Sequence, residues 1–163
     1  TDVVADTVDT NNLTGVSTGG DRQGCRVFLS TNQDLSAGAR TKIQFDSESY
    51  DSDNNFDQSS HNWTCPKDGL YMVNLQVSFV LGGTDERTIR IATGTSEFTN
   101  NEGAFNRQVS SNSGDGLSVS TINKYNSGDT IAGYCRNVDN NDTLSSGSGS
   151  AATFMEVAFL GGL

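Results

Sequence analysis

An alternation of apolar and polar side chains within residues 69–81 (GLYMVNLQVSFVL), strict over residues 73–79, constrains this chain more than any other feature. In an extended chain Asn74, Gln76 and Ser78 fall on one side, and the other side is apolar: Tyr71, Val73, Leu75, Val77 and Phe79. A period of two is that of a strand with one buried face. No segment shows a helical period or an apolar stripe as long as a helix. We therefore predict an all-β protein.

Further strand-like segments follow one another along the chain, separated by turn-forming Gly, Asn and Asp residues. They are residues 25–31, 41–45, 62–65, 87–93, 105–110, 116–125, 129–136 and 152–160. About nine or ten such strands make an antiparallel sandwich or a closed antiparallel sheet. The Ser- and Gly-rich residues 140–152 (NNDTLSSGSGSAA) are predicted to form a mobile loop between the last two strands.

The length and charge of the chain exclude several classes of protein. Its 163 residues suit one domain with a sizeable core. With 20 Asp and Glu against 10 Lys and Arg, a net charge of −10 argues against a nucleic-acid partner, because phosphate binding needs clustered cations. No apolar run is long enough to insert in a membrane. The acid-rich, lysine-poor balance suits either a surface that stays hydrated in high salt or an ordinary acidic extracellular surface.

The cysteines leave two alternatives open. Cys25, Cys65 and Cys135 are odd in number, so at least one is unpaired, and no two have the spacing of a zinc site. Either all are buried free thiols, or Cys65 and Cys135 form a disulfide bridge.

Residues 56–66 (FDQSSHNWTCP), followed by Gly69 and Tyr71, carry the most specific local pattern. They match in length the run Tyr-Asp-Pro-Ser-Thr-Gly-Lys-Phe-Thr-Cys-Pro, followed by Gly-Ile/Val-Tyr, and so resemble the complement C1q globular-head family within the tumour-necrosis-factor-like jelly rolls. Residues 43–46, 125–134 and 153–160 resemble other strands and turns of that family. The resemblance covers residues 25–163. It implies an antiparallel jelly-roll sandwich of about ten strands that forms a homotrimer.

The chemistry of several residues within this motif predicts their roles without the resemblance. Trp63 and Tyr71 flank the turn at residues 66–69 and are predicted to pack in the core. Asp57 precedes two serines and is predicted to accept hydrogen bonds from its own loop. His61 stands where the family usually has Gly, so this turn is expected to differ from the family's.

Metal binding and catalysis find little support. The alternating residues Asp51, Asp53, Asn55 and Asp57 imitate a helix-loop-helix calcium loop, but Phe56 replaces its glycine and Asn62 replaces its bidentate glutamate, so that motif is rejected. Members of the resembled family often bind calcium through loop acids near the trimer apex, which implies Asp115 as a candidate calcium ligand, against a solvated acidic loop. No other cofactor is expected. His61 is the only histidine and has no recognisable nucleophile motif beside it, so we predict that the protein is not an enzyme.

The long strand also predicts how the trimer assembles. One of its faces must fill the sandwich, and the other is then left for a neighbouring subunit. We expect that interface to contain Leu70, Met72, Asn74, Gln76 and Ser78. A closed three-fold axis would bury such a mixed face without leaving open edges.

Residues 1–24 are predicted to form an arm that precedes the jelly-roll domain of residues 25–163. Sparse apolar residues are expected to dock the arm on a capsid or fibre protein: Val3, Val4, Val8, Leu13 and Val16. With neither a secretion signal nor a collagen repeat visible, we expect a decoration or spike head on a virus particle, for which a salt-loving host would fit the charge balance. The alternative is a secreted or cell-surface recognition head that binds a protein or glycan.

Overall fold

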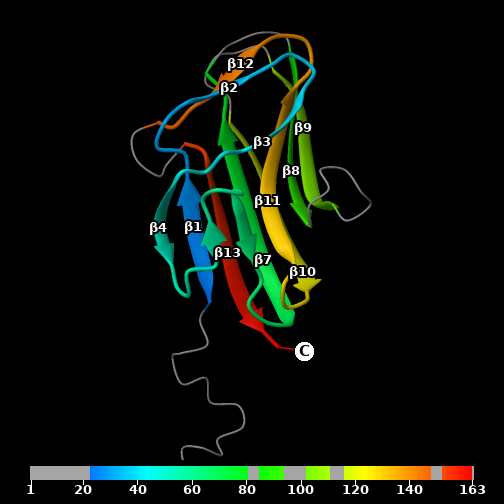
Figure 1. Cartoon of the computed structure of the whole chain (residues 1–163). Helices are drawn as coiled ribbons and strands as arrows, with labels where there is room; N and C mark the ends of the chain where they lie inside the picture. Colours follow the sequence, from blue (N-terminus) through cyan, green and yellow to red (C-terminus); the bar gives the residue numbers. More distant parts are fainter. Residues whose placement is uncertain (1–22, 81–84, 94–101, 111–115, 148–151, 163) are drawn as a thin grey trace, which may run out of the picture.

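The computed structural model describes residues 23–80, 85–93, 102–110, 116–147 and 152–162 (Figure 1). Within these ranges every regular element is a strand, and there is no helix that could cross a membrane. The strands are β1 (Gly24–Phe28), β2 (Gln33–Leu35), β3 (Arg40–Lys42), β4 (Ser47–Asp51), β5 (Phe56–Asp57), β6 (Asn62–Thr64), β7 (Gly69–Ser78), β8 (Asp85–Thr93), β9 (Glu102–Ser110), β10 (Gly116–Tyr125), β11 (Thr130–Asn137), β12 (Asp142–Leu144) and β13 (Phe154–Gly161).

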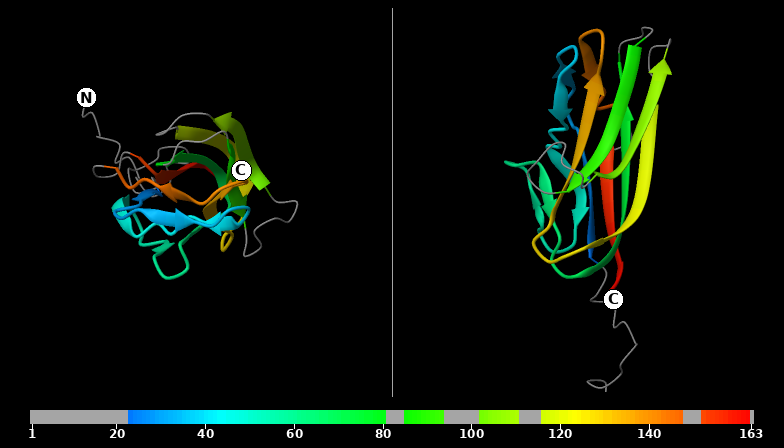
Figure 2. Two further views of the ribbon diagram at one scale, coloured as in Figure 1. Left: turned by 90° about the horizontal axis from the view of Figure 1, so that it is seen from above. Right: turned by 90° about the vertical axis from the view of Figure 1, so that its right-hand side faces the viewer.

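Two antiparallel sheets form the body of the molecule. A five-stranded sheet has the order β10-β7-β13-β1-β4, and a six-stranded sheet has the order β5-β6-β11-β8-β9, with β3 also paired to β11. The edge-on view in Figure 2 shows β13 and β10 in one layer and β11 in the other. A small sheet of β12 and β2 lies at the end remote from the C-terminus (Figure 1). The predicted all-β antiparallel jelly-roll sandwich is confirmed.

Strand β7 shows how the alternating sequence produces the core. Its apolar residues and the one that follows are fully buried: Tyr71, Val73, Leu75, Val77 and Phe79. The intervening residues are partly buried or exposed, so they lie on the outer face of the five-stranded sheet. The buried residues of β1 and β13 meet those of β7 in a single core, which Ile89, Ile91 and Ile131 of the opposite sheet complete. Burial of one face fixes the register, because a slip by one residue would expose every core side chain.

The prediction of a loop over residues 140–152 is wrong at its beginning. Asp142–Leu144 forms β12, which pairs with β2, and both Asp142 and Leu144 are buried. The Asp142 carboxylate lies 2.9 Å from Nη2 of Arg87, and both side chains are almost completely excluded from solvent. Asn137 donates a further hydrogen bond to the same carboxylate oxygen, over 3.1 Å. Arg87, which is distant in the sequence, therefore helps to hold β12 in place, although the composition of this segment is that of a loop.

The motif at residues 56–66 forms the framework that its sequence predicts. Trp63 and Tyr71 are fully buried and pack edge to face, with ring centroids 5.6 Å apart. Oδ1 of Asp57 accepts a hydrogen bond of 2.8 Å from the backbone N–H of Ser59, and Oδ2 accepts one of 2.7 Å from the Ser60 hydroxyl. The Ser59 hydroxyl donates a further hydrogen bond of 2.7 Å to Oδ1, and this bond, with the other two, lowers the pKa of Asp57 to about 2. Both expectations are confirmed.

His61 has a backbone conformation that is more typical of glycine. Its φ is 53°, in the left-handed region that favours Gly. The imidazole Nδ1 lies 2.9 Å from the carbonyl oxygen of Phe45, which holds the side chain against the neighbouring segment. The histidine itself takes this unusual conformation, and a side-chain hydrogen bond stabilises it. That the turn differs from the family's remains a prediction.

The cysteines are the free thiols of the first alternative, and all are buried. Burial raises the pKa of Cys65 to about 12, and it also raises the pKa values of Cys25 and Cys135. Such thiols are unreactive, because the thiolate is the nucleophile.

We expect Ellman's reagent to label none of these thiols in the native protein and all of them after denaturation. Burial both blocks access and suppresses the thiolate. Counting thiols by absorbance in buffer and in guanidinium chloride checks this. A Cys65–Cys135 disulfide would instead leave only Cys25 to react in the denatured chain.

Candidate functional site

The residues predicted for the trimer interface lie together on the outer face of the five-stranded sheet. Leu70, Met72, Asn74, Gln76 and Ser78 alternate with the buried residues of β7, and Met72 is the most exposed of them, at 40%. Because β7 lies between β10 and β13, these residues occupy the interior of the sheet rather than its edge. We call this surface the outer sheet face.

An apolar strip crosses the outer sheet face at Met72. Ile122 of β10 and Ala158 of β13 are the register partners of Met72 on either side. Ile122 is 61% exposed, and Leu160 near the end of β13 is 52% exposed. Large apolar side chains gathered in this way mark an interaction surface more often than isolated ones do. Sequence reasoning missed Ile122, although an apolar residue on the polar side of β10 was a usable signal.

A chain of polar contacts crosses the same face next to the apolar strip. Arg26 of β1 forms an ion pair with Glu156 of β13, and the Arg26 guanidinium lies 3.9 Å from the ring centroid of Phe154. Asn74 donates a 3.1 Å hydrogen bond to Glu156, and the Ser120 hydroxyl donates one of 3.1 Å to Asn74. The contacts link β1, β13, β7 and β10. The outer sheet face is therefore mixed in character and already ordered.

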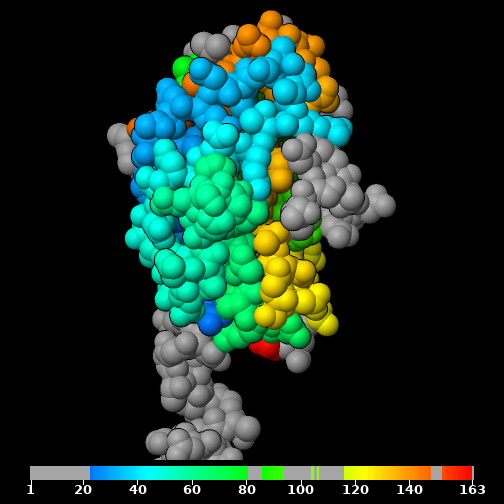
Figure 3. All heavy atoms as spheres, viewed as in Figure 1, coloured from blue at the N-terminus to red at the C-terminus, as the bar shows by residue number. Residues whose placement is uncertain are grey.

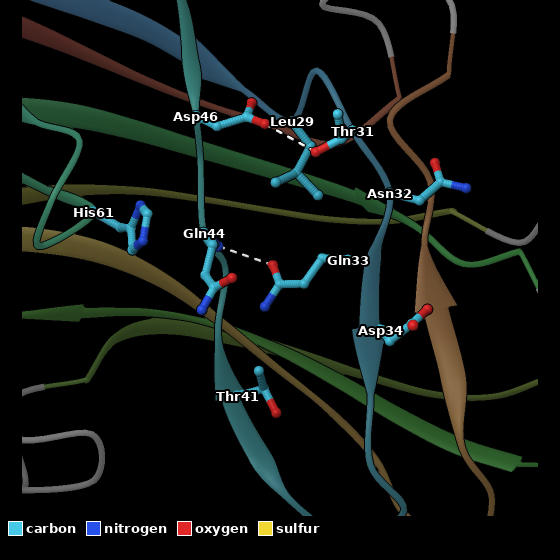
Figure 4. A pocket seen from close by; sticks show the side chains of 9 residues that line it. All are labelled: Leu29, Thr31, Asn32, Gln33, Asp34, Thr41, Gln44, Asp46 and His61. Carbon is cyan, nitrogen blue, oxygen red and sulfur yellow. Dashed lines mark hydrogen bonds between the residues drawn. The ribbon is translucent and has the colours of Figure 1, made fainter.

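A second candidate is a cavity of about 410 Å³ (Figure 4). Two stretches of chain face each other across it, residues 29–34 and residues 41–46, and His61 closes one side. These stretches lie on the face turned to the viewer in Figure 3. The lining residues are Leu29, Thr31, Asn32, Gln33, Asp34, Thr41, Gln44, Asp46 and His61. None of them lies in a strand of the five-stranded sheet, so the cavity and the outer sheet face are separate surfaces.

Hydrogen bonds hold the walls of this cavity in place. The Gln33 amide donates to the carbonyl oxygen of Lys42 over 2.9 Å, and its own oxygen accepts from the backbone N–H of Gln44 over 2.9 Å. Asp46 accepts from the backbone N–H of Ser30 over 2.6 Å, and from the hydroxyls of Ser30 and Thr31 over 3.0 and 3.1 Å. Partial burial opposes ionisation of Asp46, but these hydrogen bonds outweigh it and lower the pKa of the carboxyl. Sequence reasoning did not anticipate this cavity, because its walls come from separate segments.

Several predicted site residues lie elsewhere. Asp115 and the docking residues Val3, Val4, Val8, Leu13 and Val16 lie outside the described residues. In the described part of the chain, no group of three or more His, Cys, Asp or Glu side chains is placed to hold a metal ion. Asp51, from the rejected calcium loop, instead accepts a 2.7 Å hydrogen bond from the backbone N–H of Phe56. No serine or cysteine lines the cavity beside His61.

The sequence matches the family model of the C1q domain over residues 27–155. The match spans most of the chain and includes the motif at residues 56–66. The chain belongs to the C1q-domain family. No curated protein sequence matches it.

Solved structures of two related groups share this C1q-domain fold. Eiger TNF from S. frugiperda superposes with a TM-score of 0.64 at 12% identity, covering 87% of this chain and 94% of that one. Murine APRIL at pH 5.0 superposes with a TM-score of 0.66 at 11% identity, covering 85% and 99%. The globular domain of zebrafish complement 1qA protein gives a TM-score of 0.58 at 10% identity, covering 86% and 99%. At such identities the likeness concerns the fold, and it confirms the resemblance drawn from the motif.

Proposed function

We propose that this C1q-domain chain is a non-enzymatic recognition domain that assembles as a homotrimer through the outer sheet face. The observation that carries the proposal is the apolar strip of Met72, Ile122 and Ala158. It runs from the edge strand β10 across β7 to β13, on a sheet whose other face is already filled by the core. Exposed apolar area of this kind is stabilised by a partner that covers it.

A second copy of the chain is the partner that fits best. The face also carries polar groups beside the apolar strip, namely the Arg26–Glu156 ion pair and the Asn74 amide bonded to Glu156. Such a mixed surface is typical of an interface between subunits rather than of the core of one domain. Around Ile122, whose side chain is 61% exposed, the face is apolar enough that we expect a partner to cover it. A ring of identical subunits covers such a face once per subunit and leaves no open interface. The C1q and tumour-necrosis-factor-like resemblance implies the same three-fold assembly.

Replacing both Met72 and Ile122 with glutamate is expected to convert the trimer to a folded monomer. Assembly would bury two carboxylates at the interface without positively charged partners. Burying an unpaired charge carries a large free-energy penalty, so the trimer would dissociate. Size-exclusion chromatography with light scattering at micromolar concentration gives the mass, and circular dichroism checks the fold. Gln58→Glu, which adds a charge at an exposed turn of the other sheet, should remain trimeric. A wild-type protein that is monomeric at this concentration would contradict the proposal.

Recognition on an extracellular surface is the function we favour for the assembled head. Support comes from the C1q match and from the acidic net charge of −10. The narrower hypothesis from the sequence, a virion decoration of a salt-loving host attached through residues 1–24 to a capsid or fibre, remains a prediction. It rests on sequence features alone, among them the composition of the arm and the charge balance.

A further inference from the structure

We infer that Asn141 is a site of N-linked glycosylation, at which the side-chain amide nitrogen receives an oligosaccharide when the chain is exported. The inference rests on the proposed extracellular role, because exported chains meet this modification, but it does not rest on the homotrimer. Asn141, Asp142 and Thr143 fit the acceptor sequon Asn-x-Ser/Thr, in which x is any residue except Pro.

The sequon by itself does not select this residue. Asn12 and Asn62 begin sequons as well, and a chain rich in Asn, Ser and Thr contains several by chance. Asn12 lies outside the described residues. The choice between Asn62 and Asn141 therefore depends on where the fold places each side chain.

The amide group of Asn141 is exposed and has a fixed orientation. The residue lies at the end of the connection between β11 and β12. A 2.9 Å hydrogen bond joins the backbone N–H of Ala37 to the amide, and a backbone N–H only donates, so the bonded atom is Oδ1. Among the described residues, no acceptor is bonded to Nδ2. This nitrogen can therefore take a substituent without losing a hydrogen bond to the protein.

Burial of the middle residue keeps the sequon turned outward. Asp142 is completely buried in its ion pair with Arg87, and Leu144 is buried beside it. Side chains alternate in an extended chain, so Asn141 and Thr143 lie on the opposite side from these two residues. The acceptor amide and the hydroxyl of the sequon thus share the outward side of the chain.

Asn62 has a different environment. It lies within β6, which pairs with both β5 and β11, and its side chain is partly buried. Its Oδ1 accepts a 2.6 Å hydrogen bond from Nζ of Lys42, which also donates to the carbonyl oxygen of Ser60 over 2.7 Å. A sugar on this amide would have to fit beside a lysine that is held in place. We therefore expect the folded protein to carry a glycan at Asn141 and none at Asn62.

The position of Asn141 also suits a bulky polar group. Strand β12 belongs to the small sheet at the end of the molecule remote from the C-terminus (Figure 1). Neither β12 nor its partner β2 belongs to the five-stranded sheet. A glycan at Asn141 is thus attached outside the sheet that carries the proposed trimer interface.

The modification is a glycosyl transfer from a lipid-linked oligosaccharide. Nδ2 of Asn141 forms a bond to the anomeric carbon of the first sugar, and the bond between this carbon and the phosphate oxygen of the lipid carrier breaks. The amide loses one proton, which balances the charge of the released lipid phosphate. Nothing is oxidised or reduced, so the only co-reactant is the lipid-linked sugar.

The test is expression of the full chain behind a cleavable secretion leader in insect cells, followed by treatment with peptide-N-glycosidase F. This enzyme releases the glycan and converts the modified Asn to Asp. We expect the intact mass to fall, and peptide mass spectrometry to locate the conversion at residue 141, in secreted protein and in any chain retained in the cells. A chain without glycan, or with glycan at Asn12 or Asn62 only, would overturn the inference.

Variants connect the glycan to the sequon. Asn141→Gln and Thr143→Ala should each abolish modification at residue 141, while Thr143→Ser, which restores a hydroxyl, should retain it. The Thr143 hydroxyl bonds only the exposed Asp34 among the described residues, so these changes should leave the fold intact. Asn62→Gln is the matched control and should leave the glycan in place. Modification at residue 141 that persists in Thr143→Ala would contradict the assignment to this sequon.

The outcome is independent of assembly. The Met72/Ile122 double variant should carry the same glycan at Asn141, because both substitutions lie on the five-stranded sheet. A trimer without the glycan would contradict this inference alone, and a glycosylated monomer would contradict the proposed trimer alone.

Discussion

Replacing Asp142 with alanine is expected to lower the free energy of unfolding by about 3–5 kcal/mol, the usual cost of leaving a buried charge without its partner. Asp142 and Arg87 are 0% and 1% exposed and lie 2.9 Å apart. The Arg87 guanidinium also lies 4.8 Å from the ring centroid of Phe79, so it is enclosed by the core. Removal of Asp142 would leave this cation and the Asn137 amide without the carboxylate. Denaturant unfolding monitored by fluorescence measures the loss.

A double replacement separates the ion pair from simple burial. Arg87→Met with Asp142→Leu removes both charges and fills similar space, so it should recover most of the lost stability, because apolar replacements of buried pairs are often neutral or stabilising. Asp139→Ala, at an exposed position of the same connection, should change stability by less than about 0.5 kcal/mol. If Asp142→Ala is no more destabilising than Asp139→Ala, the pair does not hold β12 in place.

Replacing Trp63 with alanine is expected to cost about 3–5 kcal/mol, the usual range for a large aromatic side chain in a core. The ring is fully buried and packs edge to face against Tyr71, which in turn packs against Tyr125 at 5.9 Å. Trp63→Phe should cost much less, because Nε1 of the indole has no hydrogen-bond partner among the described residues. The same unfolding experiment, monitored by circular dichroism since the only tryptophan is removed, gives both values.

A different result would change the role of this residue. An aromatic side chain that binds a ligand at the surface could be removed with almost no loss of stability. If Trp63→Ala left the unfolding midpoint near that of the wild type, the motif at residues 56–66 would be a binding element rather than the framework described above.

The elements that sequence alone predicted well are those whose signal is local. In β7 the alternation of polar and apolar residues identifies both the strand and the face it buries, because side chains of a strand alternate sides whatever surrounds them. Asp57 and the two serines after it also act locally, through hydrogen bonds to residues two and three positions away. The C1q motif, with Trp63 and Tyr71, was readable for the same reason: its spacing is contained in one short stretch.

The elements that sequence missed are short, polar strands whose partners are distant. The strand β12 has three residues in a Ser- and Gly-rich stretch, and its order depends on Arg87 and on pairing with β2, which is more than a hundred residues earlier in the chain. Strands β2 and β4 likewise have too few apolar residues to show a period. Propensity and periodicity carry no information on such long-range contacts.

The sequence by itself determined the all-β class, the buried face of the long strand and the C1q resemblance, because each follows from residues close together in the chain. Only the tertiary structure decided which residues of separate segments become neighbours. It set Ile122 and Ala158 on either side of Met72 to make an apolar strip. It also brought residues 29–34, 41–46 and His61 together around one polar cavity. The register between strands and the approach of separate loops are set by packing of the whole core, and a linear pattern contains neither.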